Sequence, residues 1–221
     1  MDWRYNTIWF EQIRPEKQLT WDFKEKKGST LNLKDIEYAI LWYFRYKGLS
    51  FELLPKSDKL CYLEINLANI KDFCCIERFQ NLKRLELHYC KKLESDNGLL
   101  GLENSIEWLR IDHSKKFQST GEIAKLANLR VLALNSCGPL KSLEFLKYLP
   151  NLISFRFVDT NILDGDLTPL IEHPTLRSVG FSNKRHFNLS EEKVDLVLKE
   201  KSIEDFKEYV FKGEYRTFKY K

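Results

Sequence analysis

Two histidines and two carboxylates recur at a spacing that could bring them together on neighbouring segments. Glu86 lies two residues before His88, and Asp112 directly precedes His113. Imidazole and carboxylate groups serve as metal ligands and as general acids or bases. A metal site also needs converging geometry and supporting hydrogen bonds around the ligands, which spacing alone does not provide. We therefore expect solvated side chains here, with no metal and no catalytic residue.

Other reactive residue types also have structural interpretations. Cys90 falls where we expect a buried position, and a buried thiol is inert. His173 precedes Pro174 in an expected turn and needs no chemistry. The motifs GxGxxG, GxxxxGK[ST], HExxH and GxSxG do not occur in the sequence. We expect a protein that is not an enzyme and that uses no cofactor.

Composition narrows the choice of partners and compartment. The chain has 36 basic and 32 acidic residues, a net charge of +4, which is too mild to favour nucleic acid. The amino-terminal residues have no secretory pattern, and the apolar runs are too short for a membrane. We expect a cytoplasmic protein with reduced cysteines in its core. The five cysteines are Cys61, Cys74, Cys75, Cys90 and Cys137.

A repeat of the form LxxLxL runs through the middle of the chain. In its second block, Leu82 is followed by Leu85 and Leu87. Successive blocks are separated by 22 to 24 residues, a regularity that indicates a stacked repeat architecture. The six blocks begin at Leu60, Leu82, Ile106, Leu129, Leu152 and Leu176.

These blocks resemble the leucine-rich repeat family over roughly residues 49 to 187. The family usually has Asn or Cys three residues after the third apolar position of the block. Cys90 and Cys137 match this rule, while Ala68 and Lys184 depart from it in the end repeats. The full set at this position is Ala68, Cys90, Ser114, Cys137, Thr160 and Lys184. The resemblance implies an α/β solenoid with a curved parallel sheet, about six repeats and a cap at both ends. It also implies that these small groups bond backbone within the turn.

The physical basis of such a repeat is direct. Leu85 and Leu87 are two residues apart and therefore point to the same face of a strand. Phe73, Ile76 and Phe79 have helical spacing, which predicts a helical or 3-10 return after the strand. One repeat cannot bury its own apolar face, whereas stacked repeats form a continuous core.

Both ends of the chain break the repeat. We assign residues 1–48 to an amino-terminal cap, with strands near 7–10 and 19–23 and a helix from about residue 30 to 46. Residues 49–53 are expected to form the first edge strand of the 49–187 solenoid. Residues 188–221 are assigned to a carboxy-terminal cap, with helical spacing around 194–198 and 203–210. Its last residues could form a final strand or a loose tail.

The residues between the apolar positions of each block should face away from the core, on the concave side of the sheet. Aromatic and arginine side chains, which dominate binding hot spots, concentrate there in the first three blocks. Trp108 is the centre of the surface that we expect to bind a partner. The alternative is that these are ordinary solvent-facing charges, with Trp108 covered by the cap. The proposed surface comprises Tyr62, Glu64, Arg84, Glu86, His88, Tyr89, Trp108, Arg110, Asp112, His113, Arg156 and Asp159.

The sequence therefore favours a non-enzymatic module that binds another protein through this face. In layout the chain is similar to small bacterial leucine-rich repeat proteins, some of which are immunity proteins that cover the active site of a toxin. The resemblance implies that this chain neutralises a cognate bacterial toxin. An adaptor or substrate-recognition subunit of a larger complex is the alternative. Such a role would need a second binding element, and residues 1–48 contain no recognisable recruitment motif.

Overall fold

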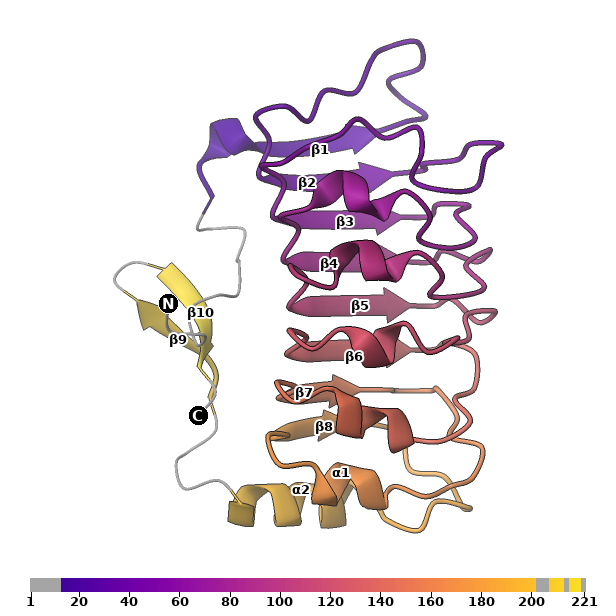
Figure 1. Cartoon of the computed structure of the whole chain (residues 1–221), viewed down its shortest axis with the longest axis vertical. Coiled ribbons are helices and arrows are strands. Elements are labelled where there is room, and N and C mark those ends of the chain that lie inside the picture. Colours follow the sequence, from indigo (N-terminus) through magenta and orange to yellow (C-terminus); the bar gives the residue numbers. More distant parts are fainter. Residues whose placement is uncertain (1–12, 202–206, 213–214, 220–221) are drawn as a thin grey trace.

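The computed structural model describes residues 13–201, 207–212 and 215–219. Within residues 13–201, one open sheet contains eight parallel strands in chain order, stacked along the long axis of the molecule (Figure 1). Its strands are β1 (Gln18–Asp22), β2 (Tyr38–Trp42), β3 (Tyr62–Asn66), β4 (Arg84–His88), β5 (Trp108–Asp112), β6 (Val131–Asn135), β7 (Ser154–Arg156) and β8 (Ser178–Gly180). The fold is thus a solenoid-like α/β stack, and the six LxxLxL blocks fall on β3 to β8.

Neighbouring strands pair without a register shift. Leu63 pairs with Leu85, and Leu85 pairs with Leu109. Because side chains alternate along a strand, this register aligns every core residue with its equivalent in the next coil. Leu85 and Leu87 are fully buried, as the repeat predicts.

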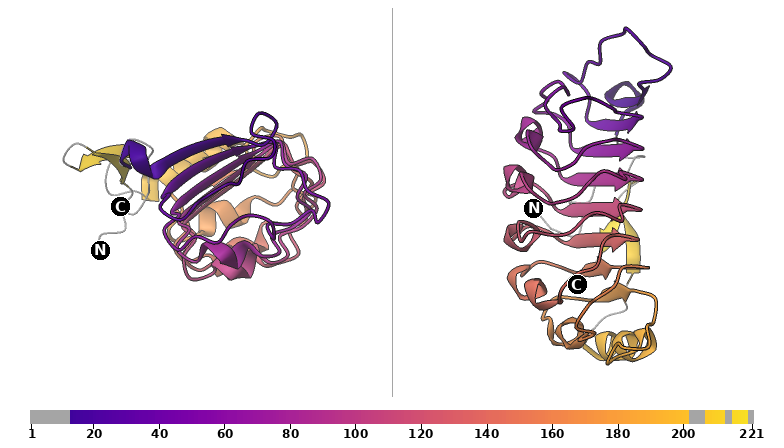
Figure 2. Two further views of the ribbon diagram at one scale, coloured as in Figure 1. Left: turned by 90° about the horizontal axis from the view of Figure 1, so that it is seen from above. Right: turned by 90° about the vertical axis from the view of Figure 1, so that its right-hand side faces the viewer.

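Short helical returns close the coils that follow β3 to β7, on the side opposite the sheet (Figure 2). Phe73, Ile76 and Phe79 are fully buried there, which confirms the predicted return. The returns are η4 (Ile76–Phe79), η5 (Leu99–Leu102), η6 (Ile123–Lys125), η7 (Glu144–Tyr148) and α1 (Thr168–Glu172). A further 3-10 turn, η3 (Pro15–Lys17), precedes β1. Among the helices in the described ranges, none is long and apolar enough to cross a membrane.

The chain leaves the sheet through a left-handed residue that directly follows each of the strands β2 to β6 and lies three residues after β7. The six residues have φ angles between 49° and 59°, a region that favours glycine, yet none of them is glycine. They are Tyr43, Leu67, Tyr89, His113, Ser136 and Asp159. Sheet hydrogen bonding continues through the first five of them; the Tyr89 amide, for example, donates to the Asp112 carbonyl at 3.0 Å. The turns are therefore stacked in register like the strands.

Small polar groups behind these turns bond backbone, as expected. The Thr160 hydroxyl donates to the Leu134 carbonyl at 2.6 Å and accepts from the Cys137 amide at 2.9 Å. Ser114 Oγ lies 3.4 Å from the Asp112 carbonyl that it bonds. Both side chains are buried, so these contacts satisfy polar groups that water cannot reach.

The helix expected up to residue 46 is wrong, because β2 occupies residues 38–42. The run from Tyr38 to Phe44 is continuously apolar, so it fits a strand buried on both faces as well as a helix. Ala39 and Leu41 occupy the two core positions. The LxxLxL pattern is hard to recognise here because alanine stands where the pattern has its second leucine. The expected strand at 49–53 is also wrong, since those residues form turns. The strand expected at 19–23 is confirmed as β1, and the one at 7–10 lies outside the described residues.

The carboxy-terminal segment begins with α2 (Glu191–Lys201), which contacts β8 and α1. Val194 and Leu198 are buried, so this helix covers the last coil as expected. The second expected helix is wrong over residues 207–210, which belong to β9 (Lys207–Lys212). Residues 203–206 lie outside the described part. β9 pairs antiparallel with β10 (Tyr215–Lys219), so the final strand is found over residues 215–219.

The five cysteines are free, and they do not share one environment. Cys90 and Cys137 are buried core residues, as expected. Cys74 is exposed, and Cys61 and Cys75 are half-buried, so the core assignment is wrong for Cys74. Cys74 and Cys75 lie in the turn before η4, where the chain passes over the surface.

Candidate partner-binding surface

The open face of the sheet is the face that carries the residues alternating with the core positions. Strand register aligns these residues into rows across β3, β4 and β5. One row contains Tyr62, Arg84 and Trp108; the next contains Glu64, Glu86 and Arg110; the last contains Asn66, His88 and Asp112. Neighbours within a row are about 5 Å apart along the backbone, which is close enough for their side chains to interact.

The first row forms a ladder of stacked rings and one guanidinium. The rings of Tyr38 and Tyr62 stack with their centroids 4.0 Å apart. Arg84 Cζ lies 4.9 Å from the Tyr62 ring centroid and 3.6 Å from that of Trp108. A cation between two aromatic faces is attracted to both. Tyr38 and Tyr62 are buried, so the accessible part of this ladder lies toward Arg84 and Trp108.

Glu86 connects this ladder to the charged rows. Its Oε1 accepts a hydrogen bond from Arg84 Nε at 2.7 Å, and its Oε2 lies 3.2 Å from His88 Nε2. Only 4% of Glu86 is exposed. A buried carboxylate is tolerated when cations and donors surround it, and these two neighbours supply both.

His88 bridges two carboxylates on adjacent strands. Its Nδ1 lies 3.2 Å from Asp112 Oδ2, while its Nε2 faces Glu86. Asp112 also accepts from Arg110 Nε at 2.7 Å and from Asn135 Nδ2 at 2.9 Å. The bonded network therefore runs across β4, β5 and β6.

These contacts change the titration of the three central groups. Burial by itself disfavours the charged forms, but the hydrogen bonds to Asp112 and Glu86 outweigh it and raise the pKa of His88 to about 9. The bonds from His88 and Arg84 likewise overcome burial and lower the pKa of Glu86 to about 2. The pKa of Asp112 is lowered by His88 and Arg110 in the same way. The network is thus a set of paired charges at neutral pH.

Solvated side chains were expected at these positions, and that expectation is wrong for the two carboxylates. Glu86 and Asp112 are 4% and 5% exposed, and both are bonded within the protein. His88 and His113 were expected to lie near each other, but the two rings contact different residues. His113 stacks on Tyr89 with ring centroids 4.4 Å apart, in the turns beyond the strand ends.

The remaining predicted residues divide into two groups. Arg110, with 39% of its side chain exposed, and the half-buried Trp108 lie on β5. Glu64 on β3 accepts from Tyr62 and from Asn66 at 3.1 and 2.8 Å. The second group lies farther along the sheet: Arg156 donates to Ser178, and Asp159 accepts from Ser182.

Strand β6 separates these two groups. Its residues in the rows of Trp108 and Arg110 are Val131 and Ala133, which are both small and buried, and only its third position, in the row of Asp112, is polar: Asn135. The polar surface of β3–β5 therefore does not run on to Arg156. Two contributors were missed at the sequence level: Tyr38, which lies in the unrecognised β2, and Asn135. An Ile36-x-x-Ala39-x-Leu41 block is the signal that marks β2.

One group of side chains on this face offers donor atoms of the kind that bind metals. Ligand atoms of Glu64, Glu86 and His88 lie within 4.8 Å of one another. These atoms already bond protein groups, and His88 carries a proton on each nitrogen when it bridges its two carboxylates. A cation would have to displace those contacts, and we assign no metal site here.

Comparison with known proteins adds no functional information. No protein-family model matches this sequence, and neither does any curated protein. The functional interpretation therefore depends on the geometry of the open face.

Proposed function

We propose that this chain is a leucine-rich repeat protein that acts by binding a partner protein through the open face of β3–β5, without catalysis. Support for the repeat comes from the six LxxLxL blocks, which fall on six consecutive, in-register strands. Support for the surface comes from its mixture of aromatic and arginine side chains, which are enriched in binding hot spots.

The observation that carries this proposal is the mutual bonding of the charged residues. Arg84 is held between Glu86 and Trp108, and Arg110 is held by Asp112 at 2.7 Å. Side chains that are already fixed lose little conformational freedom on binding, which favours affinity. A rigid, partly exposed arginine beside a tryptophan suits a specific protein contact better than a flexible solvated surface does.

Within this class, we favour a protein that neutralises a cognate bacterial toxin. Locked charges of both signs give electrostatic complementarity to one partner, fast association and rejection of wrong partners. These properties suit an inhibitor that must capture its target. A gene encoding a toxin beside the gene for this chain, together with loss of toxicity on co-expression, would test this identity.

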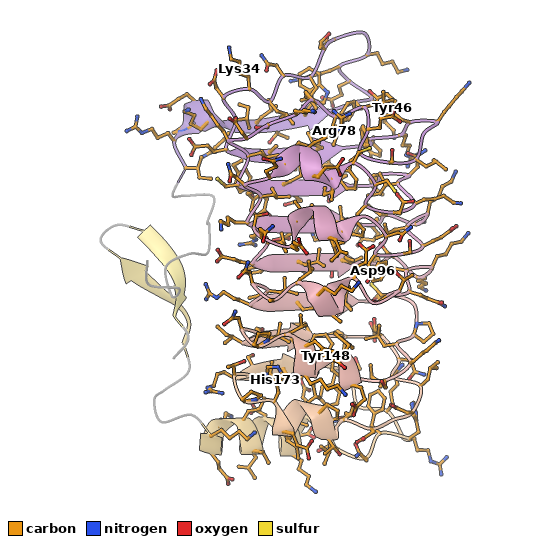
Figure 3. All side chains as sticks on the ribbon, viewed as in Figure 1. Lys34, Tyr46, Arg78, Asp96, Tyr148 and His173 are labelled. Atoms are coloured by element: carbon orange, nitrogen blue, oxygen red, sulfur yellow. The ribbon has the colours of Figure 1, made fainter. Side chains whose placement is uncertain are left out.

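The binding face is tested by pull-down from the source organism with two double variants. Trp108→Ala with Arg110→Ala should lose the captured partner, with a cost of about 2 kcal/mol or more for true hot spots. The matched control is Tyr148→Ala with Lys147→Ala on η7, where Lys147 Nζ lies 5.3 Å from the Tyr148 ring and both residues are exposed. Tyr148 lies on the side of the returns (Figure 3). If both double variants retain the partner equally, the open face is not the binding site.

Arg110→Ala alone is the second variant. Arg110 has 39% of its side chain exposed and is not part of the apolar cluster of Val131 and Ile153, against which Trp108 packs. It should therefore keep the fold while weakening capture. Thermal unfolding of each variant separates a lost contact from a lost fold.

A further inference from the structure

Four lysines border the sheet just beyond the ends of β4 and β5. Lys91 and Lys92 follow the turn after β4, and Lys115 and Lys116 follow the turn after β5. We call these four residues the lysine edge. The paired strand ends are three residues before Lys91 and Lys115, so the two pairs occupy equivalent places in adjacent coils. Adjacent coils are about 5 Å apart, which places four cations in one compact group.

These lysines are not neutralised within the described residues. All four are exposed, and their side chains have no ion pair or hydrogen bond in this part of the chain. Some other lysines of the solenoid are paired, as Lys71 is with Glu94 at 3.4 Å and Lys83 with Glu107 at 3.2 Å. Glu94 is the first carboxylate after Lys91 and Lys92 in the sequence, and its ion pair is with Lys71. The lysine edge is therefore a local excess of positive charge on a chain whose net charge is only +4.

The surroundings extend this basic surface and add one exposed ring. Tyr89 is 45% exposed and lies between the lysine edge and the open face, stacked on His113. Arg45, at the turn after β2, is also exposed. Lys24 lies near that turn, with Nζ 3.5 Å from the Tyr43 ring centroid. The strand ends of the first coils thus present cations with apolar ring surface beside them.

We propose that the lysine edge binds an acidic segment of a partner protein. Unpaired cations at this spacing complement consecutive carboxylates on an extended chain, and Tyr89 provides an apolar boundary for its side chains. The inference goes beyond the open-face proposal, because the four lysines lie outside the open face.

An acidic peptide fits this surface better than a nucleic acid does. Proteins that bind single-stranded nucleic acid combine cations with aromatic rings on which bases stack. Here His113 covers one face of Tyr89, and Lys24 lies over Tyr43. Ring surface for successive bases is therefore reduced, whereas carboxylates need only the exposed ammonium groups.

Fluorescence anisotropy with a labelled peptide of alternating Glu and Ser, about 12 residues long, tests this proposal in about 50 mM salt. The test variant carries Lys91→Gln, Lys92→Gln, Lys115→Gln and Lys116→Gln. The control variant has the same change of charge elsewhere, at four other exposed lysines: Lys56→Gln, Lys125→Gln, Lys147→Gln and Lys193→Gln. We expect the test variant to lose about tenfold or more in affinity, and the control less than about twofold. Raising the salt to about 200 mM should weaken wild-type binding strongly.

Three results would overturn the proposal. Absence of peptide binding by the wild-type protein would remove it. Equal losses in both variants would show attraction to net charge and no specific edge. Tighter binding of a single-stranded RNA of similar length, lost in the test variant, would assign the edge to nucleic acid. Circular dichroism of both variants checks the fold, which should survive because all eight side chains are exposed.

Discussion

Nδ1 of His88 on β4 lies 3.2 Å from Oδ2 of Asp112 on β5. The other ring nitrogen faces Glu86 at 3.2 Å, so the imidazole links two nearly buried carboxylates. Both nitrogens can donate only when the ring is protonated. The positive charge of His88 therefore stabilises the contact between these two strands.

Stability should consequently fall as His88 loses its proton. Its pKa is raised from 6.5 to about 9 in the folded protein, so the folded state binds the proton more tightly than the unfolded state. Its contribution is complete below pH 6.5 and is lost as the pH rises through about 9. We expect the difference in free energy of unfolding between wild type and His88→Gln to shrink by about 1–3 kcal/mol between pH 6 and pH 10. Urea denaturation at several pH values measures this difference.

His113→Gln is the matched control for that experiment. His113 is exposed and contacts the ring of Tyr89, so its substitution removes an imidazole that does not bridge the two carboxylates. Tyrosine, lysine and cysteine titrations at high pH affect all three proteins and cancel in the comparison. A constant difference for His88→Gln from pH 6 to 10 would contradict a charged imidazole in the fold.

The core of this fold was largely predictable from sequence, because the apolar alternation is explicit where leucine fills it. Leu85 and Leu87 mark β4 without ambiguity. β2 was missed because Ala39 takes a leucine position inside a continuous apolar run, where strand and helix periods both fit.

The sequence predicted which residues lie on the candidate surface, but not how deeply they are buried or which groups they bond. Alternation correctly placed the residues of three rows on one face, including Glu86 and Asp112. Glu86 bonds Arg84 and His88 of its own strand, but Asp112 also bonds residues in the neighbouring coils, more than twenty residues away in sequence. The bond from Asn135 to Asp112, for example, joins residues 23 apart, and no local pattern specifies it.

Asp96 should be one of the most important polar residues for stability. It is fully buried, and Figure 3 labels its place in the fold. Asp96 joins its own coil to the next by accepting bonds from the hydroxyls of Ser119 and Thr120 and from the amides of Thr120 and Ile123. Asp96→Ala leaves these donors without their acceptor, and we expect a loss of about 3 kcal/mol or more in urea denaturation. Burial by itself raises the pKa of Asp96, but the hydrogen bonds from Thr120, Ile123 and Ser119 together outweigh it and lower the pKa, so the contribution of Asp96 is lost as the pH falls below 3.8.

Asp166→Ala provides the comparison. Asp166 is exposed and accepts from the Thr168 amide at 2.9 Å and from Asn188 Nδ2 at 2.7 Å. Solvent can replace those bonds, so we expect a loss of about 1 kcal/mol. Equal losses at the two positions would mean that burial of Asp96 does not increase its contribution.

The cysteines should differ in reactivity in the folded protein. Burial raises the pKa of Cys90 and Cys137 to about 12, and only the thiolate reacts with alkylating reagents. The exposed Cys74 is accessible, although partial desolvation of its thiol and the neighbouring Asp72 carboxylate raise its pKa to about 11. We expect iodoacetamide at pH 8 to modify Cys74 slowly, and Cys90 and Cys137 only after urea is added. Mass spectrometry of tryptic peptides measures the order, and modification of Cys90 in the native protein as fast as that of Cys74 would contradict it.

Gly98 should tolerate no side chain, because the preceding coil passes directly against it. Its φ is +88°, and a Cβ there would lie 2.7 Å from the backbone nitrogen of Cys74 and from the carbonyl group of Phe73. Gly121 also has a positive φ, +111°, but nothing lies within 4 Å of its Cβ position. Alanine at either position adds about 1–2 kcal/mol of backbone strain, so the excess loss in Gly98→Ala measures the contact between coils. We expect Gly98→Ala to lose about 2 kcal/mol more than Gly121→Ala in urea denaturation, whereas equal losses would show that the coils can separate to admit the methyl group.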